Sequence, residues 1–490
     1  MSAAAVQDEK PIKSLIPVRM DKMPWSRFHW LVIVGLGTAW ILDGLEVQLV
    51  AAAGYQKSLG MSTTQVGLAG TVYLVGQVIG ALVFGRLTDK LGRKRLFVLT
   101  LLIYLVGSGV AGLSPNMYFL FAFRFVAGLG IGGEYSAINS AIDELIPGKY
   151  RGRVDLAING TYWFGAGLGA FANVFLLNPD HVATNVGWRI GFFIGPVLGL
   201  FIIYLRRHIP ESPRWMVTHG QSEAAEKVVA GIEEDVRSHG QQPPELDEAQ
   251  AWWIKAHEGV TGKQLRYVFF KLYPTRTVLG LTLMITQSFL YNAIFFTYAL
   301  VLQHFYGKSE SGAAFYFFPF AVGNLLGPLL LGRLFDTIGR RRMIGGCYGI
   351  AAVVLFVSAV LFKADALTAG THTALWCLSF FFASAGASAG YLTVSEIFPL
   401  EVRGQAISYF FSVAQLFGAL GPVIFGALVG EGTARNPLFW GYVMASVIML
   451  VGGLVAFRFG VDAEGKALED IAPPLSSYDE QGNQISKLPV

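Results

Sequence analysis

The sequence predicts an all-α membrane protein in which twelve transmembrane helices form two six-helix bundles related as repeats. Three observations support this fold class: the composition, the confinement of charge to a few segments, and a duplicated pair of motifs. Of 490 residues, 53% are hydrophobic and 14% are charged, whereas soluble domains contain about 25% charged residues. One span of the bilayer core needs about 20 apolar residues, so this chain has enough apolar residues for about twelve.

The charged residues are concentrated in three segments that we interpret as lying outside the membrane. Residues 1–28, 206–276 and 459–490 contain 36 of the 70 charged residues. This distribution argues against a soluble globular protein. The two cysteines and the many aromatic residues argue against disulfide-rich and disordered classes. The net charge of +4 does not indicate nucleic-acid binding, because the basic residues lie next to apolar runs, where they act as topology signals.

Six apolar windows precede the central polar stretch and six follow it. We expect the spans at residues 29–51, 65–85, 96–113, 117–143, 154–177, 187–205, 277–303, 311–331, 343–362, 374–395, 405–429 and 437–458. The chain therefore divides into an N-terminal segment (1–28), an N-terminal bundle (29–205), a linker with short helices (206–276), a C-terminal bundle (277–458) and a tail (459–490).

Two features of the polar segments can be predicted. In the linker, Val228, Ile232 and Val236 recur at helical spacing, which predicts a short amphipathic surface helix. The tail contains Pro473-Pro474 and scattered charges, and we expect it to be flexible.

The basic residues predict the orientation of the spans. Lys and Arg gather in alternate loops, and such loops face the cytoplasm. Both termini and the linker are then cytoplasmic, and the chain is expected in the cell membrane. The basic residues of these loops are Arg86, Lys90, Arg93, Lys94, Arg95, Lys149, Arg151, Arg153, Arg333, Arg340, Arg341, Arg342 and Arg403.

A duplicated pair of motifs is the strongest signal in the chain. GRLTDKLGRKR at 85–95 recurs as GRLFDTIGRRR at 332–342, and the E-x-x-P-x-x-x-R-G at 144–152 recurs at 396–404. The offsets are 247 and 252 residues, so the two halves are expected to be parallel repeats. Such repeats form a substrate site between the halves, near the bilayer midplane.

The charges of these motifs are candidates for a cytoplasmic gate. Asp89 and Asp336 are expected to meet arginines and helix N-termini across the seam between the halves. We also expect ion pairs within each second motif, Glu144 with Arg151 and Glu396 with Arg403. The alternative is that the charges only set topology. The candidates are Arg86, Asp89, Arg93, Glu144, Arg151, Arg333, Asp336, Arg340, Glu396 and Arg403.

Together with Trp188-Arg189 and PESPRW at 210–215, the duplicated motifs make the chain resemble the major facilitator superfamily over essentially its whole length. The resembled branch is that of the sugar porters and the related metabolite–proton and organic-ion symporters. The resemblance implies the major facilitator fold and secondary transport by alternating access. It also implies that Glu211 and Arg214 belong to cytoplasmic helices that brace the inward gate.

The first span contains two carboxylates, Asp43 and Glu46, and these are candidates for proton coupling. Carboxylates in membrane helices are costly and usually functional, and a spacing of three places them near one face. Arg124 in the fourth span is the expected partner, and a static buried ion pair is the alternative. In the resembled symporters such a pairing joins helices one and four, and Glu46 with Arg124 matches it best.

Glu134 is a further candidate for proton coupling or substrate binding. It follows Gly128, Gly130, Gly132 and Gly133, whose spacing favours close helix packing and not a dinucleotide site. A plain buried glutamate is an equal alternative.

Polar and aromatic side chains in spans five, seven and eleven are the substrate-binding candidates. Amides offer both donors and acceptors. In span seven, the sugar-porter pattern Q-Q-x-x-G-x-N is matched only in part, with Thr286 and Leu290 as departures. Span ten also lacks the G-P-x-x-W of the sugar porters, and span five has NGTYW at 159–163 where they usually place glutamine. These two losses weaken a hexose interpretation and favour an organic acid or an aromatic metabolite. The candidates are Asn159, Tyr162, Trp163, Gln287, Tyr291, Asn292 and Gln415.

The sequence therefore predicts a secondary active transporter of a small organic metabolite, an organic or aromatic acid or a sugar-like compound, working as a proton symporter. The alternatives are a facilitative sugar or polyol uniporter and a non-transporting membrane sensor. No enzyme activity, cofactor, metal or nucleic-acid partner is expected. The expected partners are the substrate, protons and the lipid bilayer, and the chain is expected to be a monomer.

Overall fold

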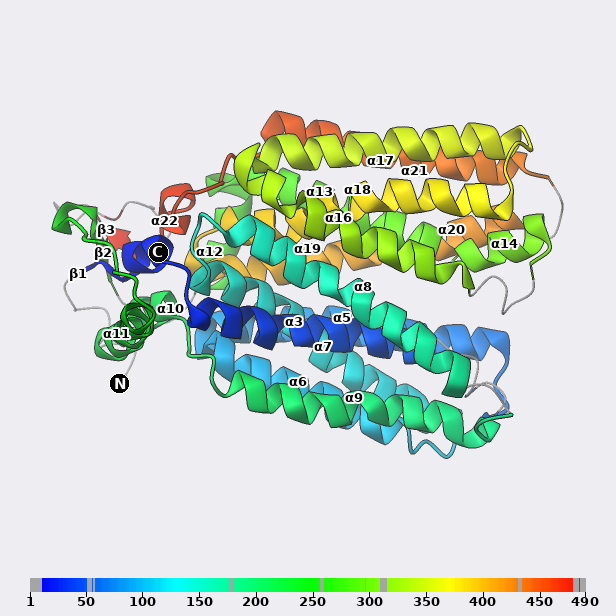
Figure 1. The fold of residues 1–490 in the computed structure, drawn as a ribbon, viewed down its shortest axis with the longest axis horizontal. Coiled ribbons are helices and arrows are strands. Elements are labelled where there is room, and N and C mark those ends of the chain that lie inside the picture. Colours follow the sequence, from blue (N-terminus) through cyan, green and yellow to red (C-terminus); the bar gives the residue numbers. More distant parts are fainter. Residues whose placement is uncertain are drawn as a thin grey trace.

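The protein is described by a computed structural model that covers residues 11–50, 55, 58–176, 180–255, 260–295, 297–308, 315–430, 434–478 and 484. Two helical bundles lie side by side, and a layer of short elements covers one end of both (Figure 1). We call this end the linker end, because residues 206–276 lie there.

Each bundle contains six spans. The N-terminal spans are α3 (Arg27–Val50), α5 (Thr63–Leu91), α6 (Arg93–Ala111), α7 (Met117–Leu145), α8 (Arg151–Leu176) and α9 (Thr184–Arg206). The C-terminal spans are α13 (Pro274–Phe295) continued by α14 (Tyr298–Tyr306), α16 (Phe317–Thr337), α17 (Arg340–Lys363), α18 (Ala369–Glu396), α19 (Arg403–Gly418) continued by α20 (Leu420–Val429), and α21 (Asn436–Phe459).

Eleven helical stretches among the described residues are long and apolar enough to cross a membrane. The span outside that set is α8, which has the necessary length but contains Arg151, Arg153, Asp155 and Asn159 in its first turns. The predicted all-α fold of twelve spans is therefore confirmed, and α8 is the most polar of them. The polar residues of α8 lie where the two bundles meet.

Glycines allow the spans to pack closely. A Cβ atom on Gly44 of α3 would collide with the backbone of Tyr162 in α8, and one on Gly165 would collide with Ile41. The glycine run of α7 packs in the same way, because a Cβ on Gly132 would collide with the backbone of Gln77 in α5. These glycines therefore serve helix packing, as the spacing predicted.

The turns of the duplicated motif require glycine. Gly92 has φ 95° and Gly339 has φ 110°, a backbone region that disfavours other residues. Each glycine separates two consecutive spans, α5 from α6 and α16 from α17.

The layer at the linker end is built from three parts of the chain that are distant in sequence (Figure 1). The N-terminal segment contributes β1 (Ile12–Ser14) and α2 (Ile16–Lys22). The linker contributes α10 (Pro213–Thr218), α11 (Ser222–Ser238), a 3-10 turn (Glu248–Gln250), β2 (Trp252–Ile254), α12 (Gly262–Tyr267) and a π-helical turn (Val268–Leu272). The tail contributes α22 (Leu468–Ile471) and β3 (Ser477–Tyr478).

A three-stranded antiparallel sheet joins these three parts. Ile12 pairs with Ile254 and Trp253 pairs with Tyr478, in the strand order β1-β2-β3. The predicted amphipathic helix is α11, which buries Ile232 and Val236 as expected. It buries Val229 in place of Val228, which is only half-buried.

The expectation of a flexible tail is wrong for its described part. The Glu401 carboxylate accepts hydrogen bonds from the backbone N–H groups of Leu475 and Ser476 at 3.0 and 2.9 Å. Glu469 forms an ion pair of 2.6 Å with Arg214 of α10, and both side chains are buried. The polar groups of the tail thus have buried partners, which composition alone does not reveal.

We predict that Glu469→Gln destabilises this layer. Arg214 is 1% exposed and is held by Glu469 and Asp21. Burial alone would lower the pKa of Arg214, but these two carboxylates raise it above its ordinary value. Weakening one charged partner of a buried group costs about 1–3 kcal/mol, so the thermal unfolding midpoint of the purified protein should fall and proteolysis of the tail should accelerate.

The matched control is Asp470→Asn, which changes the neighbouring acid, whose side chain is exposed. Equal behaviour of the two variants would contradict a structural role for the Glu469 ion pair.

Candidate functional site

At the linker end, each bundle contains the same buried ion pair. Arg93 Nη2 lies 2.8 Å from Glu144 Oε1 in the N-terminal bundle, and Arg340 Nη2 lies 3.0 Å from Glu396 Oε1 in the C-terminal bundle. Each arginine begins a span immediately after the glycine turn, and each glutamate lies at or near the end of another. The duplicated motifs therefore build two equivalent pairs.

A second set of ion pairs crosses between the bundles and corrects the expected pairing. Arg403 Nη1 lies 3.3 Å from Glu144 Oε1, and Arg151 Nη1 lies 3.4 Å from Glu396 Oε1. The expected pairs Glu144–Arg151 and Glu396–Arg403 are absent from the ion pairs of the described residues. The reason is the packing of α8 against α16 and α18, and of α19 against α5 and α7, which turns the first arginine of each helix toward the other bundle.

The motif aspartates complete the contact between the bundles. Asp89 accepts hydrogen bonds from the N–H groups of Gly404 and Gln405 at 3.1 and 2.9 Å. Asp336 likewise accepts from Gly152 and Arg153 at 3.0 and 2.9 Å. A carboxylate at a helix N-terminus is stabilised by the N–H groups and the helix dipole. The contact expected from the sequence is thus present, from each bundle to the first turn of a helix in the other.

We call these eight residues the inter-bundle latch. Its members are Asp89, Arg93, Glu144, Arg151, Asp336, Arg340, Glu396 and Arg403. Because all of these contacts are formed, the structure is closed at the linker end.

The remaining gate candidates take other positions. Arg86 and Arg333 are exposed, and no ion pair involves them among the described residues. Glu211 accepts hydrogen bonds from the N–H groups of Arg93 and Lys94 at 2.9 and 3.1 Å. Burial raises the pKa of Glu211, although these bonds partly offset that rise. Glu211 and Arg214 therefore brace the linker helices against the start of α6 and against the tail.

Asp43 lies where the two bundles face each other. Its Oδ2 accepts a hydrogen bond of 2.9 Å from the Tyr135 hydroxyl, and its Oδ1 is buried with no hydrogen-bond partner. The Tyr135 ring stacks on Phe411 of the C-terminal bundle with centroids 4.9 Å apart, and Tyr391 lies at 6.2 Å. A carboxylate of one bundle is therefore linked through a single tyrosine to the other bundle.

Glu46 points into the N-terminal bundle instead. Ser108 of α6 donates a hydrogen bond of 2.9 Å to Glu46 Oε2, and the carboxylate packs against Gly195 of α9. Arg124 lies over the Tyr73 ring at 4.2 Å, and its Nε has no hydrogen-bond partner. No ion pair joins Arg124 to Glu46 among the described residues, so the direct pairing expected from the sequence is not formed in this conformation.

Glu134 pairs with a residue that the sequence did not single out. Arg206 Nη2 lies 3.1 Å from Glu134 Oε1, and Arg206 Nε donates to the Gly35 carbonyl at 3.2 Å. Arg206 is the last residue of α9, and an arginine at the end of a span is usually interpreted as a topology signal. The pair favours the interpretation of Glu134 as a buried structural acid.

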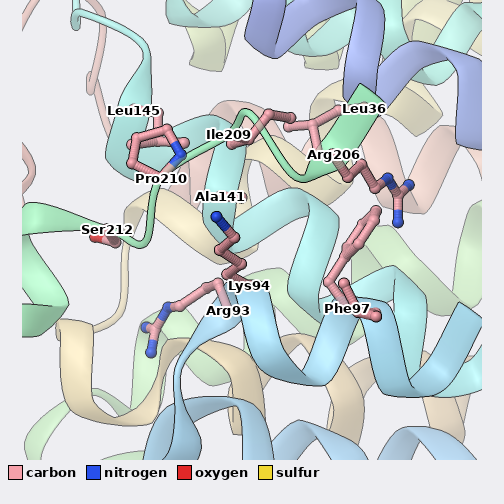
Figure 2. Close-up of a pocket in the computed structure, with 11 residues that line it drawn as sticks. Leu36, Arg93, Lys94, Phe97, Ala141, Leu145, Arg206, Ile209, Pro210 and Ser212 are labelled. Atoms are coloured by element: carbon pink, nitrogen blue, oxygen red, sulfur yellow. The ribbon is translucent and has the colours of Figure 1, made fainter. Parts of the chain in front are cut away.

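A pocket beside this pair opens within the N-terminal bundle and not between the bundles (Figure 2). The Arg206 guanidinium lies over Phe97 there. The lining residues are Leu36, Arg93, Lys94, Phe97, Val98, Ala141, Leu145, Arg206, Ile209, Pro210 and Ser212. Its position makes it unsuitable as a path for solute between the two bundles.

Aromatic rings from both bundles meet in one layer. Trp163 of α8 lies 5.7 Å from Tyr291 of α13 and 5.7 Å from Phe320 of α16, measured between centroids. The neighbouring Tyr162 is half-buried, and the Tyr291 hydroxyl donates a hydrogen bond of 2.8 Å to Asn324. The predicted residues Tyr162, Trp163 and Tyr291 thus lie together at the contact between the bundles.

The amide candidates are largely engaged by their own bundle. Asn292 Nδ2 donates to the Ser288 carbonyl at 2.7 Å, and Gln415 Oε1 accepts from the Ser288 hydroxyl at 2.9 Å. Asn159 Nδ2 donates to the Asp155 carboxylate at 3.1 Å. Gln287 interacts with the Tyr391 hydroxyl, and Tyr391 lies beside Tyr135 of the other bundle, so this amide lies near the contact between the bundles.

Tyr135, Tyr391 and Phe411 lie at the site but were not predicted from the sequence. Only Phe411 has a sequence signal, and it is indirect: with the motif offset of 252 residues, it corresponds to the candidate Asn159 of span five. Among the described residues, no group of three or more His, Cys, Asp or Glu side chains has the arrangement of a metal site.

We predict that Glu396→Gln shifts the protein toward an open linker end, because it weakens the Glu396 contacts with Arg340 and Arg151. If the closed state loses about 1.4 kcal/mol, the open-to-closed ratio rises roughly tenfold. The measurement is alkylation of a cysteine placed at Ser408, a buried residue that faces Gly85 across the bundles, in a protein with Cys347 and Cys377 replaced by serine.

Arg333→Gln is the control, since Arg333 is an exposed charge of the same motif. The latch assignment is wrong if Glu396→Gln labels no faster than this control.

Comparisons with known proteins agree with this architecture. The family model described as "Sugar (and other) transporter" matches residues 38–474. The niacin transporter NiaP of Acinetobacter baylyi is 24% identical over 458 residues, which cover 92% of this chain and 98% of that protein. The glucose transporter GlcP of Staphylococcus epidermidis is 25% identical over 431 residues, covering 85% and 90%.

The fold is also similar to that of a solved structure, the major facilitator superfamily proton:xylose symporter XylE bound to 6-bromo-6-deoxy-D-glucose. The TM-score is 0.74 at 20% sequence identity, covering 91% of this chain and 98% of that one. At this identity the likeness shows the fold alone.

Proposed function

The chain belongs to the sugar (and other) transporter family of the major facilitator superfamily, and we propose that it is a proton-coupled importer of a small aromatic carboxylic acid. The linker end, where basic residues gather, faces the cytoplasm in this proposal. Substrate passes between the bundles as they rock about their contact.

The observation that carries the proposal is the chain of contacts from Asp43 through Tyr135 to Phe411. Asp43 is 3% exposed, and it accepts a hydrogen bond from a tyrosine whose ring stacks on the other bundle. Whether Asp43 is neutral or charged therefore affects the side chain at which the bundles meet. This connects the loading of a proton to the movement of the bundles.

Desolvation gives the direction of this coupling. An unpaired carboxylate is costly to bury, so closure of the bundles around Asp43 favours its neutral, proton-bearing form. When the bundles separate on the cytoplasmic side, water reaches Asp43 and hydration stabilises its ionised form. A proton taken up on one side is then released on the other.

The aromatic layer supports an aromatic substrate. Trp163, Tyr291 and Phe320 place π faces at the contact between the bundles, where a planar ring gains stacking energy. The buried, unpartnered Nε of Arg124 supplies positive charge for a carboxylate. One relative is named as a niacin transporter, and niacin is an aromatic acid of this class.

A facilitative sugar transporter is the second candidate. It is favoured by the amides Gln287, Asn292 and Gln415 and by the relative named as a glucose transporter. Against it, Asn292 and Gln415 already bond to Ser288, which leaves fewer free groups for hydroxyls.

We predict that proteoliposomes containing the protein accumulate radiolabelled nicotinate or 4-hydroxybenzoate when the outside is more acidic, and that glucose and xylose do not compete. Accumulation should collapse when a protonophore removes the gradient. Sugar uptake that ignores the gradient would establish the second candidate instead. Binding of the acids without any flux would identify a sensor.

We predict that Asp43→Asn abolishes gradient-driven accumulation of that acid while exchange of internal for external substrate continues. The neutral amide mimics the protonated acid but cannot release a proton. Glu46→Gln is the comparison, because Glu46 faces Ser108 and Gly195 inside one bundle; we expect it to retain most of the accumulation. The opposite ranking of the two variants would assign the proton to Glu46.

A further inference from the structure

Two buried carboxylates near the latch have no role in the mechanism above. Asp143 of α7 and Asp155 of α8 are each 0% exposed. The Oδ1 of Asp155 lacks a hydrogen-bond partner, and its Oδ2 accepts a bond from Asn159. Asp143 has no close hydrogen bond, although the Ser395 hydroxyl of the other bundle interacts with it. The two carboxylates repel each other electrostatically.

In the closed latch, the arginines near these two acids are already paired with other carboxylates. Its four arginines are matched by its four acids, Asp89, Glu144, Asp336 and Glu396. Asp143 is influenced by Glu396, Arg151 and Arg403, and Asp155 by Asp143, Glu396 and Arg340. A buried charge without a partner is too costly to keep, so at least one of the two acids holds a proton in the closed protein.

Two further oxygens of α7 near Asp143 are also unpartnered. Asn139 Oδ1 and Ser140 Oγ are buried without hydrogen-bond partners. They lie on the same helix, one turn before Asp143. Asn139 Oδ1 only accepts hydrogen bonds, so a protonated carboxyl beside it supplies the donor that it lacks, which supports a protonated site.

Arg151 offers a partner for Asp155 once the latch opens. It precedes Asp155 by four residues on α8, a spacing at which opposite charges pair along a helix. In the closed protein, Arg151 reaches Glu396 of the other bundle and Asp21 of the N-terminal segment, but its Nε has no partner. A free donor and a free acceptor thus lie one turn apart.

The second bundle lacks this arrangement. With the motif offset of 252 residues, Arg151 corresponds to Arg403, but Asp143 and Asp155 correspond to Ser395 and Ile407. The latch is symmetric, whereas the unpaired acids belong to the N-terminal bundle alone. A purely structural part of the latch would not require that difference.

We propose that Asp155 is a proton-release site governed by Arg151. When the bundles separate at the linker end, Arg151 loses Glu396 and pairs with Asp155, whose carboxyl proton passes to water as its O–H bond breaks. When the latch closes again, Arg151 returns to Glu396 and Asp155 takes up a proton. The inference deepens the proposed proton coupling, but it makes no reference to the transported substrate.

The test measures latch opening against pH without substrate. Spin labels on cysteines at Arg86 and Arg333, exposed residues of opposite bundles, report the open-to-closed ratio by electron–electron distance measurement in lipid nanodiscs, with Cys347 and Cys377 replaced by serine. Each proton released on opening raises this ratio about tenfold per pH unit over the range in which only the closed state holds the proton. Asp155→Asn should reduce the slope of the logarithmic plot by about one proton.

Asp155→Glu keeps an ionisable group and should retain the slope, which separates titration from packing. Asp155→Ser is a second neutral variant for use if the asparagine variant does not fold. An unchanged slope in a folded neutral variant overturns the proposal. A response to Na⁺ concentration in place of pH, lost in Asp155→Asn, also overturns it and identifies a sodium site.

Failure here leaves the substrate proposal standing, because the uptake of aromatic acids is measured separately. If uptake fails, the pH dependence of latch opening can still be interpreted, because it is measured without substrate.

Discussion

Buried charge must be balanced whenever the linker end is closed, and this constraint governs the architecture. The latch removes eight charged groups from water. Each bundle contributes an arginine–glutamate pair, and each glutamate accepts a second arginine from the other bundle.

Buried ion pairs offset their desolvation only with good geometry and additional hydrogen bonds. The aspartates meet that condition at helix N-termini, where glycines allow the close approach. Because the pairs cross between bundles, closing gives each of the eight groups a partner of opposite charge or a backbone N–H group, and opening separates these partners. A layer of this kind favours two discrete states over a continuous range.

The linker layer extends the same principle beyond the bundles. Arg214 joins the tail to the linker through Glu469, and Asp21 joins Arg214 to Arg151 of the latch. The N-terminal segment, the linker and the tail also share one small sheet. Any separation of the bundles at this end therefore changes the surroundings of Arg151, where the sheet-bearing layer and the latch meet. The layer is a mechanical part of the closed state and not a set of passive loops.

The sequence predicted the fold well because its signals are local and repeated. Span lengths follow from hydropathy, and the duplicated motifs identify the latch residues and the helix N-termini that Asp89 and Asp336 cap. The partners of the latch glutamates could not be predicted, because they depend on how α8 and α19 pack across the contact between the bundles. Glu144 was expected to pair with Arg151 but pairs with Arg403. The same limit applies to Glu46, whose direction into α6 and α9 depends on the rotation of α3 about its axis. Tyr135 and Phe411 carry no motif, and only their stacking across the bundles reveals them.

The two repeats differ in where they place buried carboxylates. With the first-motif offset of 247 residues, Asp43 and Glu46 correspond to Leu290 and Ala293. With the second offset, Asp143 and Asp155 correspond to Ser395 and Ile407. Among the described residues, the buried carboxylates of the C-terminal bundle lie only at its linker end. Its interior instead presents Gln287, Tyr291 and Phe320 to the N-terminal bundle. In the proposed mechanism, the proton is carried by one bundle and the ring contacts come from the other, so the bundles must meet before either affects the other. Tyr135 is that meeting point, because its hydroxyl bonds to Asp43 while its ring stacks on Phe411. The proposed coupling thus needs no long pathway, because one side chain contacts both the ionisable group and the other bundle.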